Sequence, residues 1–385
     1  MIINLKNNEF IFKLYVFLST FARNLVEVFV PIILYKNGFS FKQVILYFLL
    51  TNFFCLLWDY SCVLLSKKYS NKILSLISMI SFFLLQFILS SIKINTFYLI
   101  LVALLYSLYR QTYWISRRFY SFKILRGGEI SKKYSIISII NQIGVVVSVY
   151  IGSLILDYIN VSVLTIVSVI IFIISVIILF LLRFDHEKND EKIHFFKTLK
   201  TIPKQDLCHF GFYELLNIIK FLFALYIFIY IKNNYQTIGI ISIVINISIM
   251  MFSYFYAKYI DKNIDKNRNL LQVSILLVVL TFILKANVTN YLIIIVSFIE
   301  GMTFKMYEIS FNSRLYVLSK KYEYYNFNMV YEIVLNFFRT IVMFILFMSN
   351  FDLRTMIYFT LLVIIMGVFI EFKDVNIDKY KVVDK

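Results

Sequence analysis

Long apolar runs separated by short polar loops make up most of the chain. The runs lie near residues 10–35, 43–65, 73–92, 96–116, 134–157 and 161–182, and then near 207–231, 236–257, 269–287, 290–313, 328–349 and 353–371. Each is close to the roughly 20 residues that a helix needs to cross a bilayer. The pattern predicts twelve transmembrane helices, six in each half of the chain.

One long hydrophilic stretch separates the two sets of runs. It extends from Arg183 to Asp206 and reads RFDHEKNDEKIHFFKTLKTIPKQD. We expect residues 1–182 to form one six-helix bundle and residues 207–385 to form a second, with a short tail. Residues 183–206 are the predicted loop between the two bundles.

The composition indicates a membrane protein. Of the 385 residues, 61% are hydrophobic and 16% are charged, which is far outside the range of soluble globular proteins. The expected fold class is an all-α integral membrane protein, with twelve transmembrane helices in two six-helix bundles.

The net charge of +17 by itself would suggest a nucleic-acid partner. Most of the lysines and arginines, however, lie in the short loops between the predicted helices. Cationic loops of this kind stay on the cytoplasmic side, where they meet anionic lipid headgroups. We therefore expect the lipid bilayer, through its headgroups, to be the partner of these charges, and we expect no nucleic-acid partner.

The loops differ strongly in charge between the two sides. One set, within 67–72, 117–133, 183–204, 258–268 and 314–321, holds 22 lysines and arginines. The other set holds six, namely Lys36, Lys42, Lys93, Lys232, Lys285 and Arg354. Because basic loops are retained in the cytoplasm, we expect a multi-pass protein of the cell membrane with both termini and the central loop cytoplasmic.

The sequence offers no pattern for a metal site, a cofactor or catalysis. The three cysteines, Cys55, Cys62 and Cys208, form no CxxC pair, and the three histidines lack ligand spacing. There is no nucleotide-binding loop and no catalytic triad. We therefore expect neither a metal nor a cofactor and do not expect an enzyme.

The loop after the second predicted helix of the first half has an ordered pattern. Cys62 is followed by three residues, then Ser66, Lys67 and Lys68, and after three more residues Lys72. A short basic loop such as this is weakly informative by itself.

The same position in the second half carries a related loop. Ala257 is followed by three residues, Asp261 and Lys262, and the basic run ends at Arg268. Here the chain resembles the major facilitator superfamily, whose corresponding loop runs Gly, three residues, Asp, a cation and a basic cluster. The first copy departs from this pattern at both the Gly and the Asp, the second at the Gly alone. The resemblance covers the whole chain.

The resemblance implies two six-helix bundles related by a pseudo-two-fold axis along the membrane normal. It also implies a central cavity lined mainly by helices 1, 4, 7 and 10 of the twelve. We accordingly expect a monomer whose partners are a small-molecule solute and protons. The paired loops are predicted to gate the conformational change through Lys67, Lys68, Lys72, Asp261, Lys262 and Arg268.

Charges inside the predicted helices are few and nearly balanced. A charge near the bilayer centre is costly, so such residues usually pair and face the protein interior. The five cations are Arg23, Arg110, Lys220, Lys305 and Arg339, and the six acids are Glu27, Asp59, Glu214, Glu300, Glu308 and Glu332. Four of these cations lie on helices 1, 4, 7 and 10, which the family places around its cavity.

We predict a solute and proton pathway formed by Arg23, Glu27, Arg110, Tyr113, Trp114, Lys220, Glu300, Lys305 and Glu308. Arg23 and Glu27 are four residues apart and can pair within one helix, and Lys305 is expected close to Glu308. Either Glu300 or Glu27 can carry a proton.

Glu300 is the acid expected to contribute most to coupling, because burial disfavours a lone carboxylate. It is predicted either to take up a proton or to pair with Arg110 or Lys220. Structural roles compete with the other assignments. The Arg23–Glu27 pair can simply hold its helix in the bundle, and the aromatic residues can be ordinary packing.

Three further charges are expected to have structural or gating roles. Asp59 and Glu332 lie toward the predicted cytoplasmic ends of their helices, which favours locking of a gate over contact with the solute. Arg339 is central in a helix that is usually peripheral to the cavity, so pairing across helices is predicted for it.

The fifth predicted helix contains Gly144, Ser148, Val149, Gly152 and Ser153. This resembles the antiporter signature of the superfamily, a Gly, three residues and then Gly-Pro-x-x-Gly-Gly, with Ser148, Val149 and Ser153 standing for Gly, Pro and the last Gly. Small residues also permit close helix approach, which is the structural alternative. The resemblance favours efflux over uptake.

We interpret the chain as a secondary active transporter that moves a small organic solute by alternating access, coupled to protons. The alternative is a degenerate member of the same family that acts as a sensor, an immunity factor or a partner of another protein. An enzyme acting on lipid-linked substrates is disfavoured, because no loop is long enough to house a site.

Overall fold

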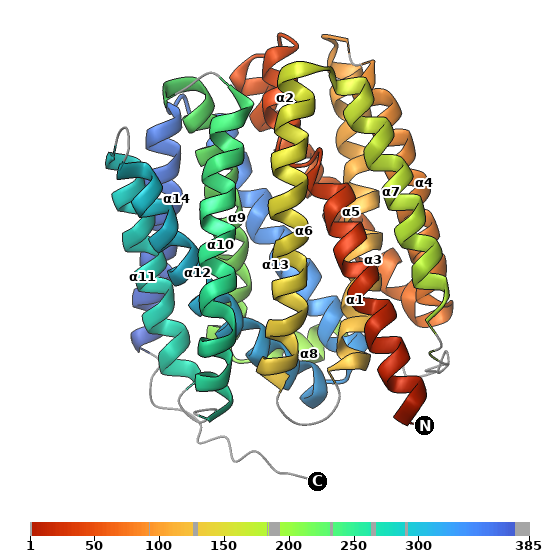
Figure 1. Ribbon diagram of the computed structural model, residues 1–385. Helices are drawn as coiled ribbons and strands as arrows, with labels where there is room; N and C mark the ends of the chain where they lie inside the picture. The colour runs from red at the N-terminus through yellow and green to blue at the C-terminus, as the bar shows by residue number, and fades with distance from the viewer. Residues whose placement is uncertain are drawn as a thin grey trace.

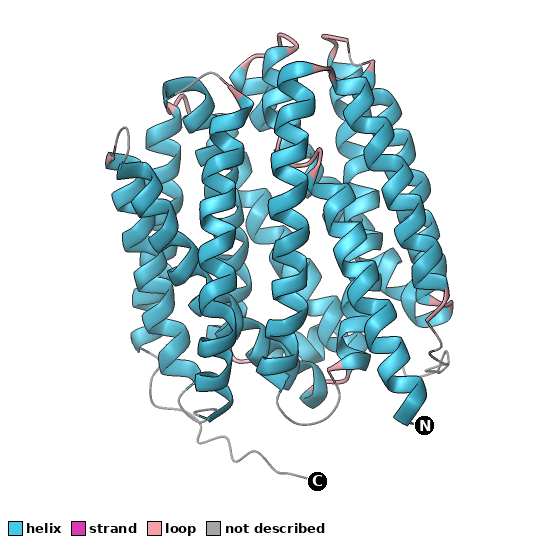
Figure 2. Cartoon of the chain, in the orientation of Figure 1, coloured by secondary structure: helices cyan, strands magenta, loops and turns pink. Residues whose placement is uncertain are grey.

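The computed structural model describes residues 2–91, 93–125, 130–182, 184, 193–231, 234–262, 267–288 and 292–373. These ranges are helical, with short connections and no strand among them (Figure 2). In chain order the elements are α1 (Ile2–Asn24), α2 (Val30–Lys36), α3 (Phe41–Lys68), α4 (Asn71–Ser90), α5 (Thr96–Ile124), α6 (Ile130–Tyr158), α7 (Val161–Phe180), α8 (Phe195–Thr201), α9 (Lys204–Tyr226), the π-helical turn η1 (Ile227–Ile231), α10 (Tyr235–Lys262), α11 (Asn267–Asn287), α12 (Leu292–Lys321), α13 (Tyr324–Met348) and α14 (Leu353–Lys373).

Eight helices of the described chain are long and apolar enough to cross a membrane by length and composition: α3, α4, α6, α7, α9 (continued through η1), α10, α11 and α13. The described apolar part of α14 is shorter, at Leu353–Val368. Helices α1, α5 and α12 carry charged residues in their interiors and lie alongside the others (Figure 1). With α1 and α2 taken together, this arrangement agrees with the predicted all-α membrane fold of twelve spans.

The first predicted span, residues 10–35, is not one helix. Helix α1 ends at Asn24, and α2 begins at Val30 with Pro31 in its first turn. In a continuous helix the ring of Pro31 would meet the carbonyl of Glu27, four residues earlier, and its missing N–H would remove a hydrogen bond. The chain therefore breaks at residues 25–29.

The first span of the second half ends in an irregular turn. Helix α9 changes to the π-helical turn η1 at Ile227 and remains so through Ile231. Both irregular segments lie toward the same end of the molecule (Figure 1).

Helix starts follow local capping signals. The Ser40 side chain accepts a bond from the Gln43 backbone N–H, and the Gln43 side chain accepts one from the Ser40 N–H. The side chains of Asn95 and Asn160 cap α5 and α7 in a similar manner. Such caps satisfy amides that would otherwise lack partners at the start of a helix.

Helices of each half pack mainly among themselves. In the first half α1 packs on α6 and α7, and α5 packs on α3 and α4. In the second half α12 packs on α10 and α11, and α9 packs on α13 and α14. The most extensive contacts between the halves are those of α6 with α10 and of α3 with α13. Helices α6 and α10 stand side by side in Figure 1.

The end of the molecule that holds α8, the start of α1 and the end of α14 is called here the basic end (bottom of Figure 1). Lys67 and Lys68 end α3 there, and Lys320 and Lys321 end α12 there. Within the predicted loop 183–206 the structure contains the helix α8 and the start of α9. Residues 183 and 185–192 lie outside the described residues.

Candidate functional site

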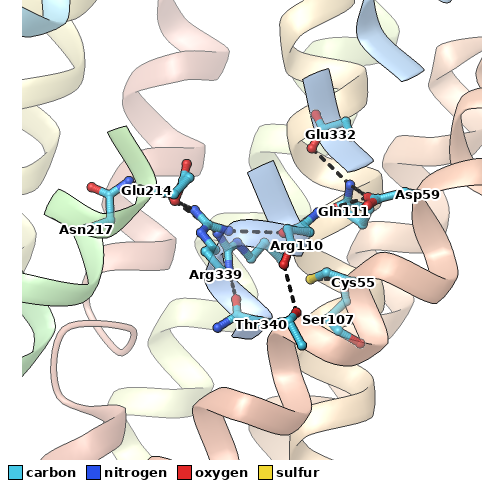
Figure 3. Close-up of polar contacts among 12 residues, drawn as sticks. Cys55, Asp59, Ser107, Arg110, Gln111, Glu214, Asn217, Glu332, Arg339 and Thr340 are labelled. Atoms are coloured by element: carbon cyan, nitrogen blue, oxygen red, sulfur yellow. Dashed lines mark hydrogen bonds and ion pairs between the residues drawn. The ribbon is translucent and has the colours of Figure 1, made fainter. Parts of the chain in front are cut away.

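A line of polar side chains runs along the contact between α3, α5 and α13, joined by one residue of α9 (Figure 3). On α13 these residues are spaced four, four and three apart, so they share one face of the helix. We call this set the polar seam. It consists of Asp59, Arg110, Gln111, Arg118, Glu214, Asn328, Glu332, Asn336 and Arg339.

One carboxylate at the centre of the seam serves two guanidinium groups. Arg339 of α13 forms a salt bridge with Oε2 of Glu214 on α9. Arg110 of α5 places Nη2 3.9 Å from the same oxygen, and Asn217 donates to it at 3.1 Å. Because Arg110 belongs to the first half and Glu214 to the second, this cluster joins the halves (Figure 3). The predicted pairing of Arg339 across helices is confirmed.

Gln111 of α5 links two acids. Its Nε2 donates to Oδ1 of Asp59 and, at 3.0 Å, to Oε2 of Glu332. Asn336 donates to both oxygens of Asp59, at 3.0 and 3.1 Å. Figure 3 shows Gln111 between the two carboxylates, one from each half of the chain.

Asp59 differs from the other buried acids in its partners. It is 0% exposed, and among the described residues no lysine or arginine nitrogen lies within 4.0 Å of its carboxylate. Its bonds come from neutral amides alone. A buried carboxylate held by amides beside a second acid is a group whose charge depends on the conformation around it.

Arg118 and Glu332 close the seam nearer the basic end. Arg118 of α5 forms a salt bridge with Glu332 of α13 and donates to Asn328 at 2.7 Å. Its guanidinium lies 4.5 Å from the ring centre of Tyr331. Glu332, for which a gate-locking role is predicted, is thus paired across helices, and its partner Arg118 belongs to the residues predicted as loop cations.

Aromatic contacts continue this closure beyond Arg118. Phe119 and Phe122 of α5 pack edge-on against Tyr324 of α13, with ring centres 5.7 and 5.5 Å apart. Tyr316 of α12 donates to the backbone oxygen of Leu125 at 3.1 Å. The two halves are therefore in contact at the basic end.

The predicted Arg23–Glu27 pair is confirmed, with 3.3 Å between Nε and Oε2. It lies at the break between α1 and α2. The Arg23 guanidinium is 4.7 Å from the ring centre of Trp114 and 5.5 Å from that of Tyr113. Thus Arg23, Glu27, Tyr113 and Trp114 come together, as cation–aromatic contacts favour in a desolvated site.

Arg117 contacts the same aromatic pair, with its guanidinium 5.0 Å from Trp114. It donates to the Tyr113 hydroxyl and to Asn141, both at 2.7 Å. Its partners are neutral, and no described carboxylate lies within salt-bridge distance of it. Tyr113, which joins the Arg23 and Arg117 contacts, is 1% exposed.

A second polar line joins α12 to α6. Lys305 pairs with Glu308 at 3.0 Å, as predicted, and also donates to Ser138. Tyr134 of α6 donates to Glu308 at 2.9 Å. Lys305 and Glu308 therefore connect the two halves where α6 meets α12. The polar seam connects them on the opposite side, where α3 meets α13.

Glu300 has a partner that differs from the two predicted. Its Oε2 lies 2.5 Å from Nζ of Lys285 on α11, and the two residues are 1% and 2% exposed. Neither Arg110 nor Lys220 pairs with it, so that expectation was wrong. Lys285, predicted to be a loop cation, lies within α11, because this helix continues to Asn287.

Lys220 of α9 is the remaining predicted cation. Its Nζ lies 2.9 Å from the ring centre of Phe304 on α12. Among the described residues no carboxylate oxygen lies within 4.0 Å of it.

The predicted gate residues lie at helix ends, away from these clusters. Lys68 and Lys262 are exposed, and Lys67 is half-buried. Lys72 donates to the backbone oxygen of Phe180 at 2.9 Å. The side chains of Asp261 and Arg268 lie outside the described residues.

Ser66 occupies the acid position of the first loop. It is buried and donates to Asn71 at 2.7 Å, so this copy holds its turn with a neutral bond.

The predicted pathway omitted Asp59, Gln111, Glu214, Glu332, Asn336 and Arg339. The sequence feature that points to some of these residues is the spacing of Glu332, Asn336 and Arg339, which places them on one face of an otherwise apolar span. No sequence feature points to Gln111, because a single amide in an apolar helix has many possible neighbours.

Among the described residues no group of three or more His, Cys, Asp or Glu can hold a metal ion.

Comparison with known proteins fits this geometry. A family model described as the Major Facilitator Superfamily matches residues 14–330. The chain belongs to this superfamily. No curated protein matches the chain. Membership and fold together support a secondary transporter that moves a solute across a membrane.

Two solved structures of this superfamily's fold illustrate the similarity. One is the crystal structure of a single-residue mutant of the nucleoside transporter NupG, with a TM-score of 0.72, 14% identity and coverage of 96% of this chain and 100% of that one. The other is the human organic anion transporter MFSD10 (TETRAN), with a TM-score of 0.69, 9% identity and coverage of 95% and 99%. At these identities the likeness concerns the fold alone.

Proposed function

We propose that this protein is a proton-coupled secondary transporter of a small organic solute that works by alternating access. The observation that carries the proposal is the polar seam, in which Asp59, Arg110, Gln111 and Arg118 of the first half meet Glu214 and the α13 residues of the second. Rocking of one half against the other exposes the central residues to the basic end only if these contacts break.

The moving bodies in this proposal are residues 1–182 and 207–385, with residues 183–206 as the link between them. By the charge rule the basic end, both termini and the link are cytoplasmic, and the protein is a monomer in the plasma membrane. The seam then closes the cytoplasmic side of the pathway in this conformation.

Asp59 is the acid we assign to proton coupling. In the closed seam Asp59 is buried, has no lysine or arginine nitrogen within salt-bridge distance and lies beside the Glu332 carboxylate, and burial and the second carboxylate favour its neutral form. When α3 and α13 separate, water reaches the Asp59 carboxyl group and Glu332 moves away with α13, which favours loss of the proton. Protonation and closure of the seam are thereby linked.

Glu300 and Glu27 are less suited to this role. Each is already bonded to a lysine or arginine of its own half, Lys285 for Glu300 and Arg23 for Glu27. A proton on either acid would have to displace that cation, and neither pair crosses between the halves. The structure therefore favours structural roles for these pairs, which was the alternative considered for Arg23 and Glu27.

The proposed direction is export, and it rests on the resemblance of residues 144–153 of α6 to the antiporter signature. A Cβ at Gly152 would lie 2.7 Å from the backbone oxygen of Leu25, and one at Gly144 would lie 3.1 Å from that of Phe17. These glycines let α6 approach α1 beside the helix break, where a rigid contact can transmit movement. The same small residues are what the antiporter resemblance rests on.

The test is solute flux in proteoliposomes that contain the purified chain. Solutes would first be selected by growth and uptake of overexpression and deletion strains across compound classes. We expect transport against a gradient when a pH difference is imposed, and its collapse when a protonophore is added. Binding without flux would instead favour the sensor, immunity or partner role.

A further inference from the structure

Buried charge in the centre of the molecule is unequal. Eight cations that are buried or half-buried lie there, Arg23, Arg110, Arg117, Arg118, Lys220, Lys285, Lys305 and Arg339, against six acids, Glu27, Asp59, Glu214, Glu300, Glu308 and Glu332, and Arg110, Arg118, Lys220 and Glu27 are the half-buried ones. The difference is two positive charges if all are ionised. If Asp59 is neutral, the excess is three. Uncompensated charge in a membrane interior is costly and marks sites of function.

Lys220 is the cation for which the structure offers the least compensation. The acids nearest to Phe304 along α12, Glu300 and Glu308, already pair with Lys285 and Lys305. Among the described residues, Lys220 has no ion pair, and its cation–aromatic partner is Phe304, whose ring centre lies 2.9 Å from Nζ. A cation–aromatic contact stabilises an ammonium group by less than its removal from water costs.

The position of Lys220 along α9 suits a ligand. It lies six residues beyond Glu214, or about 9 Å along the helix axis, on the side away from the basic end. The cluster of Arg110, Glu214 and Arg339 therefore lies between Lys220 and the salt bridge of Arg118 with Glu332. A small organic molecule is long enough to extend from that cluster to Lys220.

Aromatic side chains accompany these cations. On α5, Tyr106 and Trp114 flank Arg110 at intervals of four residues and, like it, are only half-buried. On α9, Tyr213 lies seven residues before Lys220 and is half-buried as well. Helical spacing places each set on one face of its helix. These faces offer an apolar surface beside an excess of positive charge.

We propose that Lys220 binds the acidic group of the transported solute, which is an organic anion with an apolar or aromatic body. Its negative charge offsets the excess of buried cations, and its body packs against the aromatic faces of α5 and α9. This inference rests on the proposed function and adds the substrate class and the residue that selects it.

The first test measures binding to the purified full-length chain by thermal unfolding. Three probes share one body and differ in charge: 3-phenylpropionate, 3-phenylpropanamide and 3-phenylpropylamine. Chloride and sulfate are added separately as inorganic anions. We expect stabilisation by the carboxylate well above that by the amide or the amine, and little from the inorganic ions. Equal stabilisation by amine or amide, or a full effect from chloride or sulfate, overturns the proposal.

The second test replaces Lys220. In Lys220→Met the affinity for 3-phenylpropionate should fall at least tenfold, while Lys220→Arg should retain most of it. Without ligand, Lys220→Met should unfold at the wild-type temperature or above, because a half-buried charge without an ion-pair partner among the described residues has been removed. The matched change Lys285→Met removes a paired lysine and should lower the unfolding temperature. Wild-type affinity in Lys220→Met contradicts the assignment.

Failure of this inference is distinguishable from failure of the proposed function. Charge-selective binding that depends on Lys220, without flux in proteoliposomes, leaves the anion site standing and removes the transport proposal. Proton-driven flux of cationic or neutral solutes, unchanged in Lys220→Met, leaves transport standing and removes the anion site.

Discussion

Arg118 of α5 and Glu332 of α13 form a salt bridge that joins the two halves of the protein at its basic end. They lie 214 positions apart in the sequence, and each has a second polar partner, Asn328 for Arg118 and Gln111 for Glu332. The halves cannot separate there unless this contact breaks. It therefore provides a direct probe of the closed conformation.

Removing either partner should favour opening at the basic end. In Glu332→Gln or Arg118→Met, Cys55 should react faster with a maleimide, because this buried thiol lies beside the seam with Sγ 3.9 Å from the backbone oxygen of Ser107. The rate would be measured in a background with Cys62→Ser and Cys208→Ser. The charge swap Arg118→Glu with Glu332→Arg is the control and should slow labelling again. Unchanged labelling in both single variants would show that the salt bridge does not hold the gate.

Replacing Asp59 with Asn should separate exchange from accumulation. The amide resembles the protonated acid, so the seam can still close, and bound solute can still exchange. Transport against a gradient should be lost, because no proton is carried. Exchange and concentrative uptake would be measured in the same vesicles. Glu9→Gln, which removes an acid paired with Lys13 far from the seam, is the matched control. Accumulation by Asp59→Asn at the wild-type level would remove Asp59 from the coupling mechanism.

Glu300→Gln should instead be a stability variant. It leaves Lys285 buried without its partner, and breaking a buried pair costs roughly 3–5 kcal/mol. Thermal unfolding should therefore occur at a lower temperature, and the double change with Lys285→Met should recover much of the loss. Concentrative transport by the surviving folded protein should persist. A stable Glu300→Gln protein that exchanges solute but no longer accumulates it would return the coupling role to Glu300.

The orientation in the membrane is testable with reporter fusions. Fusions after Lys200 in α8 and at the carboxyl terminus should report the cytoplasm, because the basic loops gather at that end. A fusion near Asn95, which caps the start of α5, should report the exterior. A cytoplasmic signal at Asn95 would contradict the assigned orientation.

Much of the fold follows from the sequence alone. Apolar runs of sufficient length determine where helices cross the membrane, because an unpaired backbone is too costly in lipid. Pairs of residues close in the sequence are equally local. Lys305 and Glu308 are three residues apart within α12, so helix geometry brings their side chains together. Arg23 and Glu27 are four residues apart across the end of α1, where the Glu27 N–H still donates to the Arg23 backbone oxygen.

Tertiary structure decided the partners that lie on different helices. Glu300 pairs with Lys285, and Asp59 meets Gln111, because of how each helix is rotated and where it crosses its neighbours. The sequence does not specify these quantities one helix at a time. Glu214 lies between Arg110 and Arg339 for the same reason. Local spacing therefore predicted the Arg23–Glu27 and Lys305–Glu308 pairs, whereas the partner of Glu300 required the tertiary structure.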